Sequence, residues 1–283
     1  MSSKLINGKE IGSQIRKSIA KEIEDLIEKG ITPGLAVILV GEDPASQTYV
    51  ANKEKACHEL GIYSELIKLP AETSEEELLG HIEKLNSNPA IDGILVQLPL
   101  PKHINEQHVI EAISSDKDVD GFHPVSVGKM LLGQPTFLPC TPNGVMELLK
   151  YSNIDVAGKH AVVVGRSHIV GVPMGQLLLQ KDATVTYCHS KTPDLQAMTK
   201  QADILVVAVG RAKMIKSTHI KEGAVVIDVG MNRDENGKLC GDVDFDDVLD
   251  KVSAITPVPG GVGPMTITML MVNTLLSAKM KLA

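Results

Sequence analysis

Two side chains that can act on a bound ring compound stand four positions apart in the N-terminal third of the chain. Tyr49 and Lys53 share one face if this segment is helical. A tyrosine offers a flat surface on which a ligand ring can stack, and a lysine offers a proton or a positive charge. The same spacing is common on ordinary helices, where the lysine is a solvated charge. The pair is therefore a candidate for substrate binding and proton transfer, with a plain surface helix as the alternative.

An amide and three carboxylates follow further along the chain. Gln97 ends an apolar run and precedes a proline-rich stretch, where its amide can orient water or a substrate, or only cap the strand. Asp116, Asp118 and Asp120 alternate in a turn-rich loop. Calcium is disfavoured because the spacing lacks the downstream glutamate of an EF-hand. A single carboxylate that hydrogen-bonds the ring nitrogens of a ligand is the better functional interpretation, and a solvated acidic loop is the alternative.

A glycine-containing turn after an apolar run predicts a nucleotide site. Residues 161–164 are apolar, Gly165 ends the run, and Gly171 and Pro173 open a helix. A strand, a tight turn and a helix N-terminus hold a pyrophosphate because free N–H groups and a partial positive charge face the anion. The match to the general dinucleotide fingerprint is imperfect, since Ser167 replaces the second glycine and Gly171 comes one residue late. An ordinary strand-to-helix turn is the alternative.

The residues after the next expected strand favour NADP over NAD. NAD-binding units commonly place an acidic residue about 20 positions after the first glycine, where it binds the ribose 2′-hydroxyl. Here the strand at 184–188 is followed by His189, Ser190 and Lys191. These residues bring hydroxyl and basic groups and no acid. Together with Arg166 in the first turn, they can accept a 2′-phosphate.

Two later loops are expected to lie against a ligand as well. The segment 229–233, which contains Met231, has a glycine that lets the backbone approach a ligand closely. The segment 256–264 is dense in glycine and proline and opens the last helix. Such a loop is more typical of a ligand wall than of a spacer, although glycine and proline also simply build turns.

The elements that must position these side chains alternate between strand and helix. In the first half, apolar runs predict strands at 35–40, 62–69 and 91–96, with amphipathic helices between them. In the second half, strands are expected at 161–164, 184–188, 204–208, 224–229 and 253–256, followed by a long apolar helix at 265–280. This alternation predicts an α/β fold with parallel sheets and right-handed crossovers.

The two halves are expected to form two domains with a cleft between them. Residues 141–264 make a Rossmann-like nucleotide domain with a parallel sheet. Residues 1–140 show the same alternation without a glycine fingerprint and are therefore expected to carry the substrate, with the helix at 265–283 packing back onto them. Ligands in such sheets gather at the carboxyl ends of the strands.

Composition narrows the class of function. The 283-residue chain has a net charge of -7 and seven aromatic residues (four Tyr, three Phe), which disfavours nucleic acid as a partner. The four cysteines lie far apart without a CxxC pair, and the histidines show no ligand spacing such as HExxH. We therefore expect a reducing cytoplasm and no metal site. No signal peptide is expected at the N-terminus, and polar residues interrupt the last apolar helix, which favours a buried helix over a membrane span.

Taken together, these motifs resemble the bifunctional methylenetetrahydrofolate dehydrogenase/methenyltetrahydrofolate cyclohydrolase family, of the bacterial FolD type. The resemblance runs essentially from end to end. The glycine loop, irregular by the general fingerprint, has that family's normal form. Six segments match in order, namely 41–53, 93–101, 116–122, 139–142, 165–173 and 257–264.

The resemblance implies a role for each candidate on the substrate side. Tyr49 stacks on the aminobenzoyl part of a folate, Lys53 is the central catalytic residue, and Gln97 assists it. Asp120 belongs to the catalytic set and anchors the pterin ring. The loop with Pro257, Gly260 and Gly261 helps to form the folate cleft.

It also implies how the cofactor is bound and what the enzyme does. Gly165, Arg166, Ser167 and Ser190 hold the phosphates of NADP, and the backbone near Met231 lies by the nicotinamide. The implied reaction is NADP-dependent oxidation of 5,10-methylenetetrahydrofolate to the 5,10-methenyl form, then hydrolysis to 10-formyltetrahydrofolate, within one-carbon metabolism and purine biosynthesis. A cytoplasmic homodimer that binds tetrahydrofolate derivatives, and neither nucleic acid nor membrane, is expected.

Two alternatives remain open from the sequence. Another two-domain NADP dehydrogenase, such as a shikimate-type enzyme, would share the architecture without needing Tyr49, Lys53 and Gln97 around a pterin. A non-catalytic nucleotide sensor would keep the glycine loop without a reason to combine Lys53, Gln97 and Asp120.

Overall fold

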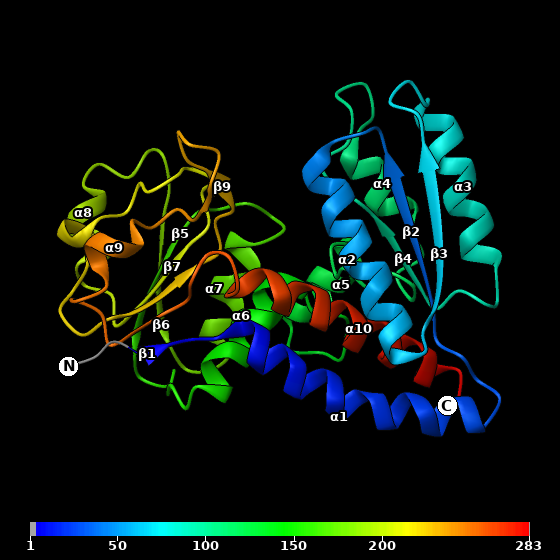
Figure 1. The fold of residues 1–283 in the computed structure, drawn as a ribbon, viewed down its shortest axis with the longest axis horizontal. Coiled ribbons are helices and arrows are strands. Elements are labelled where there is room, and N and C mark those ends of the chain that lie inside the picture. The colour runs from blue at the N-terminus through cyan, green and yellow to red at the C-terminus, as the bar shows by residue number, and fades with distance from the viewer. Residues whose placement is uncertain (1–3, 283) are drawn as a thin grey trace. The chain divides into compact units, whose positions relative to one another are not determined.

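The structure, a computed structural model, describes residues 4–282. The chain forms two compact α/β units (Figure 1). The three-stranded unit comprises 14–140 and the residues from Ile267 onward, and the six-stranded unit comprises the residues up to Ser13 together with 141–266. Each unit is built on its own sheet.

The sheet of the three-stranded unit is parallel, with the order β3-β2-β4. Its strands are β2 (Gly34–Val40), β3 (Tyr63–Leu69) and β4 (Gly93–Val96). All seven residues of β2 are buried, as expected for a central strand that is covered on both faces. Its helices are α2 (Pro44–Leu60), α3 (Glu75–Ser87), α4 (Glu106–Ala112) and α5 (Pro124–Leu131). Side chains of β2 and β4 form an apolar core with those of α3 and α4.

Local capping explains where these helices begin and end. The Asp43 carboxylate accepts the Ser46 N–H at 2.7 Å ahead of α2, and Gly61 ends that helix in the left-handed conformation with φ 73°. The Ser74 hydroxyl accepts the Glu77 N–H at 3.1 Å, and Asn105 caps α4 in the same way. A capping side chain thus marks the start of each of these three helices.

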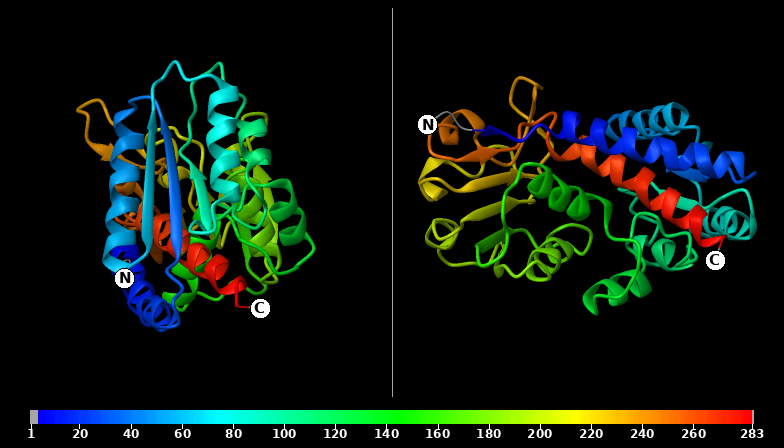
Figure 2. Two further views of the ribbon diagram at one scale, coloured as in Figure 1. Left: turned by 90° about the vertical axis from the view of Figure 1, so that its right-hand side faces the viewer. Right: turned by 90° about the horizontal axis from the view of Figure 1, so that it is seen from below.

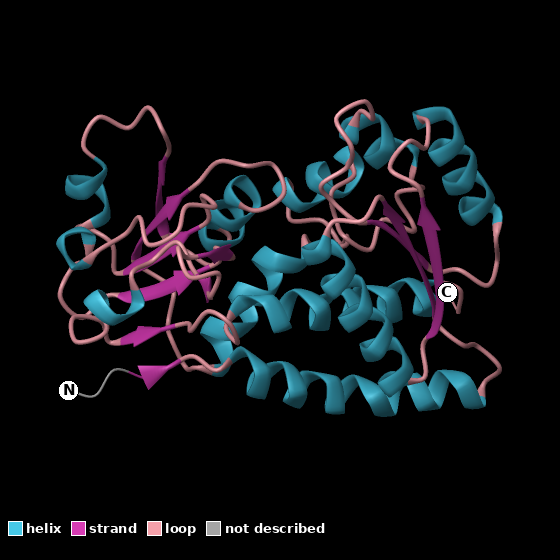
Figure 3. Ribbon diagram, turned by 45° about the horizontal axis from the view of Figure 1, so that its top comes forward, coloured by secondary structure: helices cyan, strands magenta, loops and turns pink. Residues whose placement is uncertain are grey.

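The six-stranded unit has the strand order β1-β11-β8-β7-β5-β6, and every pairing in it is parallel. Five of its strands match the expected ones: β5 (His160–Val164), β6 (Thr184–Cys188), β7 (Ile204–Val207), β8 (Val225–Asp228) and β11 (Ala254–Ile255). The helices are α6 (Cys140–Tyr151), α7 (Gly171–Leu179), α8 (Leu195–Thr199) and α9 (Phe245–Val248), with a 3-10 turn at Ser217–His219. Figure 3 distinguishes these strands and helices by colour.

Two parts of this unit were not expected from the sequence. Strand β1 (Lys4–Leu5) pairs with β11, so the chain enters the six-stranded sheet before it forms the other unit. Residues 4–13 therefore lie with the six-stranded unit, whereas the sequence-based division grouped 1–140 together. The second is a short antiparallel pair, β9 (Asn232–Arg233) and β10 (Leu239–Cys240). Two-residue strands carry too little periodicity to be recognised in a sequence.

Two long helices, α1 (Gly8–Glu28) and α10 (Val262–Met280), complete the fold. Within the three-stranded unit they lie side by side (Figure 2), where Arg16 donates to the Thr268 hydroxyl at 2.7 Å and Lys279 pairs with Glu22. The isoleucines of α1 are buried, except Ile27, which is 40% exposed in the last turn. Among residues 4–282, no helix has the length and apolar character that a membrane span needs.

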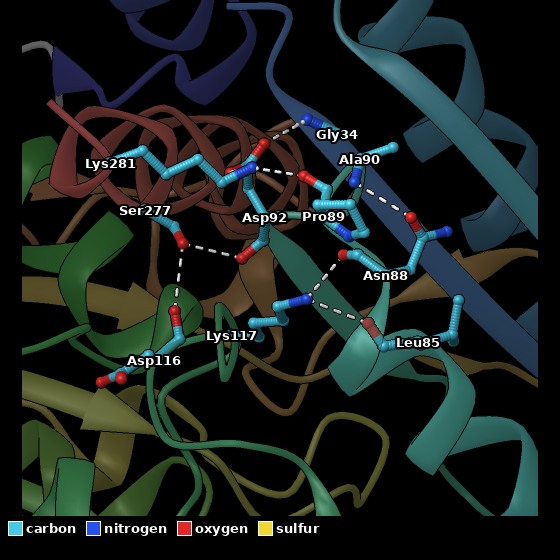
Figure 4. A network of polar contacts seen from close by, with 10 residues as sticks. All are labelled: Gly34, Leu85, Asn88, Pro89, Ala90, Asp92, Asp116, Lys117, Ser277 and Lys281. Carbon is cyan, nitrogen blue, oxygen red and sulfur yellow. Dashed lines mark hydrogen bonds and ion pairs between the residues drawn. The ribbon is translucent and has the colours of Figure 1, made fainter.

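A network of polar contacts, some of them buried, fixes the end of α10 against the start of β4 (Figure 4). The Ser277 hydroxyl lies 2.7 and 3.0 Å from the carbonyl oxygens of Asp92 and Asp116. The buried Asp92 carboxylate accepts the Gly34 N–H at 2.8 Å and pairs with Lys281 at 2.6 Å. Lys117 donates to the carbonyls of Leu85 and Asn88. The start of the loop 116–120 is thereby tied to the sheet and to α10.

Candidate functional site

Lys53 and Gln97 are brought together in the three-stranded unit. Lys53 is only 6% exposed on the inner face of α2, and its Nζ donates to the Gln97 side-chain oxygen at 2.9 Å. Gln97 directly follows β4; its backbone N–H donates to the Ile38 carbonyl and its side-chain amide donates to the Leu98 carbonyl at 2.7 Å. Because both ends of the Gln97 amide are engaged, its oxygen is held toward the lysine.

The surroundings of Lys53 favour its neutral amine. Burial lowers the pKa of Lys53, while the negative charge of Asp120 and the nearby Cys140 act in the opposite direction. Burial raises the pKa of Asp120, and the positive charge of Lys53 opposes that shift. A buried amine with a lowered pKa is a suitable proton acceptor near neutral pH.

The backbone on either side of Asp120 is positioned by two other segments, α10 and residues 138–140. The side-chain amide of Asn273 on α10 donates to the carbonyls of Val119 at 2.8 Å and Leu138 at 3.0 Å. Cys140 also contacts the Val119 carbonyl, at 3.3 Å from its Sγ. At Gly121, φ is +74° and an added Cβ would lie 2.7 Å from the backbone at Leu138, so only glycine lets the two loops approach this closely.

The three alternating aspartates have different environments. Asp118 is buried and accepts the N–H groups of Phe122 and His123 and the Ser126 hydroxyl, which holds the start of α5. The Asp116 side chain is exposed. Of the three, Asp118 therefore has a structural role, and Asp120 is the one whose charge acts on Lys53. Within residues 4–282, no group of His, Cys, Asp and Glu has the arrangement of a metal site.

Tyr49 and Cys140 extend this cluster. Tyr49 is half-buried one helical turn before Lys53, and burial raises the pKa of its phenol. Cys140 is fully buried at the start of α6, where burial, followed by the charge of Asp120, raises the pKa of its thiol well above the ordinary value. Sequence reasoning did not assign Cys140 to the site, although its motif, 139–142, was singled out.

The glycine turn of the six-stranded unit is shaped by close backbone contacts. Gly165 has φ +130°, and a Cβ there would lie 2.3 Å from the Ala208 carbonyl oxygen. A Cβ on Gly171 would lie 2.5 Å from the Gly165 carbonyl oxygen. The Ser167 hydroxyl accepts the N–H groups of Val170 and Gly171 at 3.2 and 3.3 Å. The late glycine thus has the role of close turn-to-helix packing, and the serine in place of the second glycine closes the turn.

The other residues predicted for the cofactor follow neighbouring strands of the same sheet. Arg166 is exposed in the turn after β5, and Ser190 is exposed two residues after β6. Met231, which is 44% exposed, lies between β8 and β9. Because parallel strands end at one edge, these residues share the carboxyl edge of the sheet, where a nucleotide binds in such folds.

The loop of Pro257, Gly260 and Gly261 follows β11 at that edge. Its backbone is fixed by the N-terminal segment, since the Lys9 N–H donates to the Gly260 carbonyl at 3.2 Å. A Cβ on Gly8 would lie 1.8 Å from the Gly261 carbonyl oxygen. Gly260 adopts φ +107°, which other residues rarely do. The loop is therefore held in one conformation by contacts that only glycines allow.

Two family models cover most of the chain. The catalytic domain of tetrahydrofolate dehydrogenase/cyclohydrolase matches residues 6–120, and the NAD(P)-binding domain of the same family matches residues 139–282. This chain belongs to the tetrahydrofolate dehydrogenase/cyclohydrolase family. The first model contains Tyr49, Lys53, Gln97 and Asp120, and the second contains the glycine turn.

Relatives of this family match over the full length. The bifunctional protein FolD of Lysinibacillus sphaericus is 69% identical over 100% of both chains. The crystal structure of the bifunctional FolD enzyme of Campylobacter jejuni has a TM-score of 0.96 at 52% identity and covers 99% of each chain. FolD of Trypanosoma brucei, solved with NADP cofactor and an inhibitor, has a TM-score of 0.96 at 39% identity and covers 100% of this chain and 99% of its own. The expected two-domain α/β fold with parallel sheets is confirmed.

Proposed function

We propose that this chain oxidises 5,10-methylenetetrahydrofolate with NADP and then hydrolyses the 5,10-methenyl product to 10-formyltetrahydrofolate. Family membership supports both activities. The observation that carries the catalytic assignment is the buried Lys53 amine, held at 2.9 Å by Gln97 and placed in the field of Asp120. Tyr49, one turn away on α2, provides the aromatic surface for the folate.

The oxidation is mainly a matter of positioning. NADP, when bound, accepts a hydride from the one-carbon bridge, and the folate is left as a methenyl cation. Such a transfer depends on the alignment of two bound molecules more than on side-chain chemistry. The turn with Gly165 and Ser167 fits a pyrophosphate, because the close contacts at Gly165 and Gly171 bring the start of α7 against the end of β5. Arg166 and Ser190 bind the 2′-phosphate that distinguishes NADP from NAD.

The hydrolysis requires proton transfer. Water attacks the methenyl carbon while the neutral amine of Lys53 takes a proton from that water. The bond between this carbon and N5 of the folate then breaks as the new hydroxyl group loses its proton to solvent and becomes the formyl oxygen. The proton held by Lys53 passes to N5, and the carbon remains on N10 as a formyl group. Gln97 holds the amine in place, and the Asp120 carboxyl hydrogen-bonds the pterin. Burial lowers the pKa of Lys53 and thereby increases the fraction of neutral amine that can accept the proton.

A pair of assays tests this proposal. Purified protein is given methylenetetrahydrofolate with NADP or NAD, and the methenyl and then the formyl product are followed. We expect turnover with NADP, weaker turnover with NAD, and release of the formyl product. No NADP reduction with this folate would refute the dehydrogenase, and would leave another NADP dehydrogenase or a nucleotide sensor as the function.

Substitution of Lys53 tests the role of the amine. We expect Lys53→Met to reduce hydrolysis of methenyltetrahydrofolate by at least ~100-fold, the usual contribution of a positioned acid-base group, with NADP affinity nearly unchanged. Lys55→Met is the matched control, because Lys55 lies on the same helix with an exposed side chain paired to Glu59. Full hydrolytic turnover in Lys53→Met would remove Lys53 from the mechanism.

We also propose that the protein acts as a homodimer in the cytoplasm. Strand β6 is the last in its sheet, and its Tyr187 is exposed, so this edge can receive a second copy. The four cysteines are buried free thiols, which fits a reducing compartment. Sedimentation analysis that gives only the monomer mass at working concentrations would refute the dimer.

A further inference from the structure

Two buried aspartates lie where the six-stranded sheet meets its carboxyl-edge loops. Asp228 is the last residue of β8 and is 4% exposed, and Asp242, two residues after β10, is fully buried at 0%. Neither residue was singled out from the sequence, and the proposed reaction does not use either of them. Burying a carboxylate is costly unless its oxygens are hydrogen-bonded, so the partners of this pair show what it holds together.

The Asp242 carboxylate binds two loops at once. One oxygen accepts the N–H groups of Val209 at 2.7 Å and Gly210 at 3.1 Å. The other accepts the Arg211 N–H at 2.7 Å and the side-chain amide of Asn232 at 2.9 Å. Three consecutive N–H groups of the loop after β7 are thus directed onto one side chain, which also holds the loop after β8 through Asn232.

Asp228 braces Asp242 and adds a third loop. One of its carboxylate oxygens accepts the N–H groups of Gly230 at 3.0 Å and Asp242 at 2.9 Å, and the other accepts the Val243 N–H at 2.9 Å. The backbone N–H of Asp228 donates to the Thr256 hydroxyl at 2.8 Å. Thr256 begins the glycine- and proline-rich loop that contains Pro257. The pair therefore connects the loops after β7, β8 and β11.

Two glycines make room for these carboxylates. A Cβ on Gly230 would lie 2.3 Å from the carboxylate carbon of Asp242, and a Cβ on Gly241 would lie 1.8 Å from an Asp228 oxygen. Neither glycine has a positive φ, so the requirement is space and not backbone conformation. Any side chain at either position would force a carboxylate away from its donors.

The strand order indicates which part of the cofactor these loops face. The pyrophosphate turn follows β5, and Ser190, assigned to the adenosine 2′-phosphate, follows β6. In the sheet, β5 lies between β6 and β7, and β8 follows β7. An extended dinucleotide that crosses β5 with its adenosine half on the β6 side must place its nicotinamide half on the side of β7 and β8.

We propose that Asp242, braced by Asp228, is a positioning residue for the nicotinamide half of NADP. It fixes the loops after β7 and β8 in one backbone conformation before the cofactor binds. The entropic cost of ordering these loops therefore does not weaken the binding of NADP. This inference rests on the proposed function in that it takes NADP as the cofactor.

Substitution of Asp242 tests the proposal. In Asp242→Asn, an amide NH₂ replaces one acceptor oxygen and faces N–H groups that it cannot bind. We expect the Kd for NADP to rise at least tenfold and the dehydrogenase kcat to fall, while hydrolysis of added methenyltetrahydrofolate stays within twofold. Asn232→Ala removes one of the four donors and should raise the NADP Kd and KM by a smaller factor. Asp203→Asn is the matched control, because Asp203 accepts the His160 N–H beside the start of β7, at the amino edge.

Each outcome decides the role of Asp242. A folded Asp242→Asn protein that binds NADP and transfers hydride as the wild type does would overturn the proposal. So would a parallel loss of hydrolysis and dehydrogenation, which would mark Asp242 as a purely structural residue. If Asp242→Asn does not fold, Asn232→Ala decides, and unchanged NADP Kd and KM in that variant would be the refutation. Direct NADP titration does not need a folate, so absence of methylenetetrahydrofolate oxidation in the wild type would affect the proposed function without obscuring this test.

Discussion

Asn273 offers a test of how far a residue outside the reaction controls the site. Its side-chain amide donates to the carbonyls of Val119 and Leu138, and Val119 directly precedes Asp120. We consider Asn273→Leu, which keeps a side chain of similar length and removes both donors. The position is buried at 3% exposure, so water is not available to replace them.

The size of the effect follows from the two carbonyls left without this donor. A buried polar group that loses its partner costs roughly 1–3 kcal/mol. The Val119 carbonyl still accepts a hydrogen bond from the Cys140 thiol at 3.3 Å. The cost of losing Asn273 at this carbonyl is therefore at the lower end of that range. We therefore expect the free energy of unfolding to fall by about 2–4 kcal/mol in total. We also expect the loop 119–121 to relax, which moves Asp120 and raises the KM for folate in both reactions.

Thr274→Ala is the matched control. Thr274 is the next residue on α10, is equally buried, and donates to the Leu270 carbonyl of its own helix at 2.8 Å. It should reduce stability without changing the folate KM. Urea unfolding and steady-state kinetics with folate as the varied substrate give the two readouts. A stability loss in Asn273→Leu with an unchanged folate KM would refute the link to Asp120, and an unchanged stability would refute the hydrogen-bond reasoning itself.

Two further predictions concern the six-stranded unit. In Gly171→Ala, the added Cβ would meet the Gly165 carbonyl oxygen at 2.5 Å, so the turn must open. The NADP Kd should rise while hydrolysis of methenyltetrahydrofolate is kept. Gly80→Ala is the control and should change neither quantity, because no atom lies within 4 Å of the added Cβ. Equal NADP affinity in wild type and Gly171→Ala would contradict the packing argument. The second prediction concerns pH. Burial raises the pKa of Asp228 from 3.8 to about 7. Between these two pH values the folded protein binds more protons than the unfolded chain. The free energy of unfolding therefore falls as the pH rises through this range, by at most ~1.4 kcal/mol per pH unit. Asp118, with a pKa raised to about 6, acts in the same direction, and His219, whose pKa burial lowers, acts in the opposite direction. The informative quantity is therefore the difference in unfolding free energy between wild type and Asp228→Asn, which should shrink from pH 5 to pH 7 in urea titrations; a constant or growing difference would exclude the raised pKa.

The sequence predicted what depends on local pattern. Apolar runs located the parallel strands, because the alternation of apolar and polar residues is a local property of the sequence. That Gln97 assists Lys53 was implied by the family resemblance. The strand pattern indicated only that both segments follow strands whose carboxyl ends meet at one edge of the sheet. The hydrogen bond between them could not be predicted, since it depends on how the side chain of Lys53 on α2 packs against the residue that follows β4.

The features missed by sequence reasoning have a common physical origin. Asn273 and Cys140 act through hydrogen bonds to Val119, which is distant from both of them along the chain. The Asp242 carboxylate accepts three backbone N–H groups of another loop, and such a contact leaves no periodic pattern in the sequence. Strand β1 was missed for the same reason, because two residues became a strand only when β11 was available as a partner. From the sequence, Gly230 was expected to let the backbone approach a ligand, and Gly241 was not singled out. In the structure, a side chain at either position would displace the aspartate carboxylate beside it.

Both ends of the chain return to position loops that the proposed reaction uses. At the N-terminal end, Gly8 and Lys9 hold Gly260 and Gly261. At the C-terminal end, Asn273 bonds to Val119, 154 residues away. The entropy of closing such long loops must be overcome before these contacts contribute any stability. We therefore expect a substitution at these remote contacts to affect ligand binding more than the secondary structure on which the site is built.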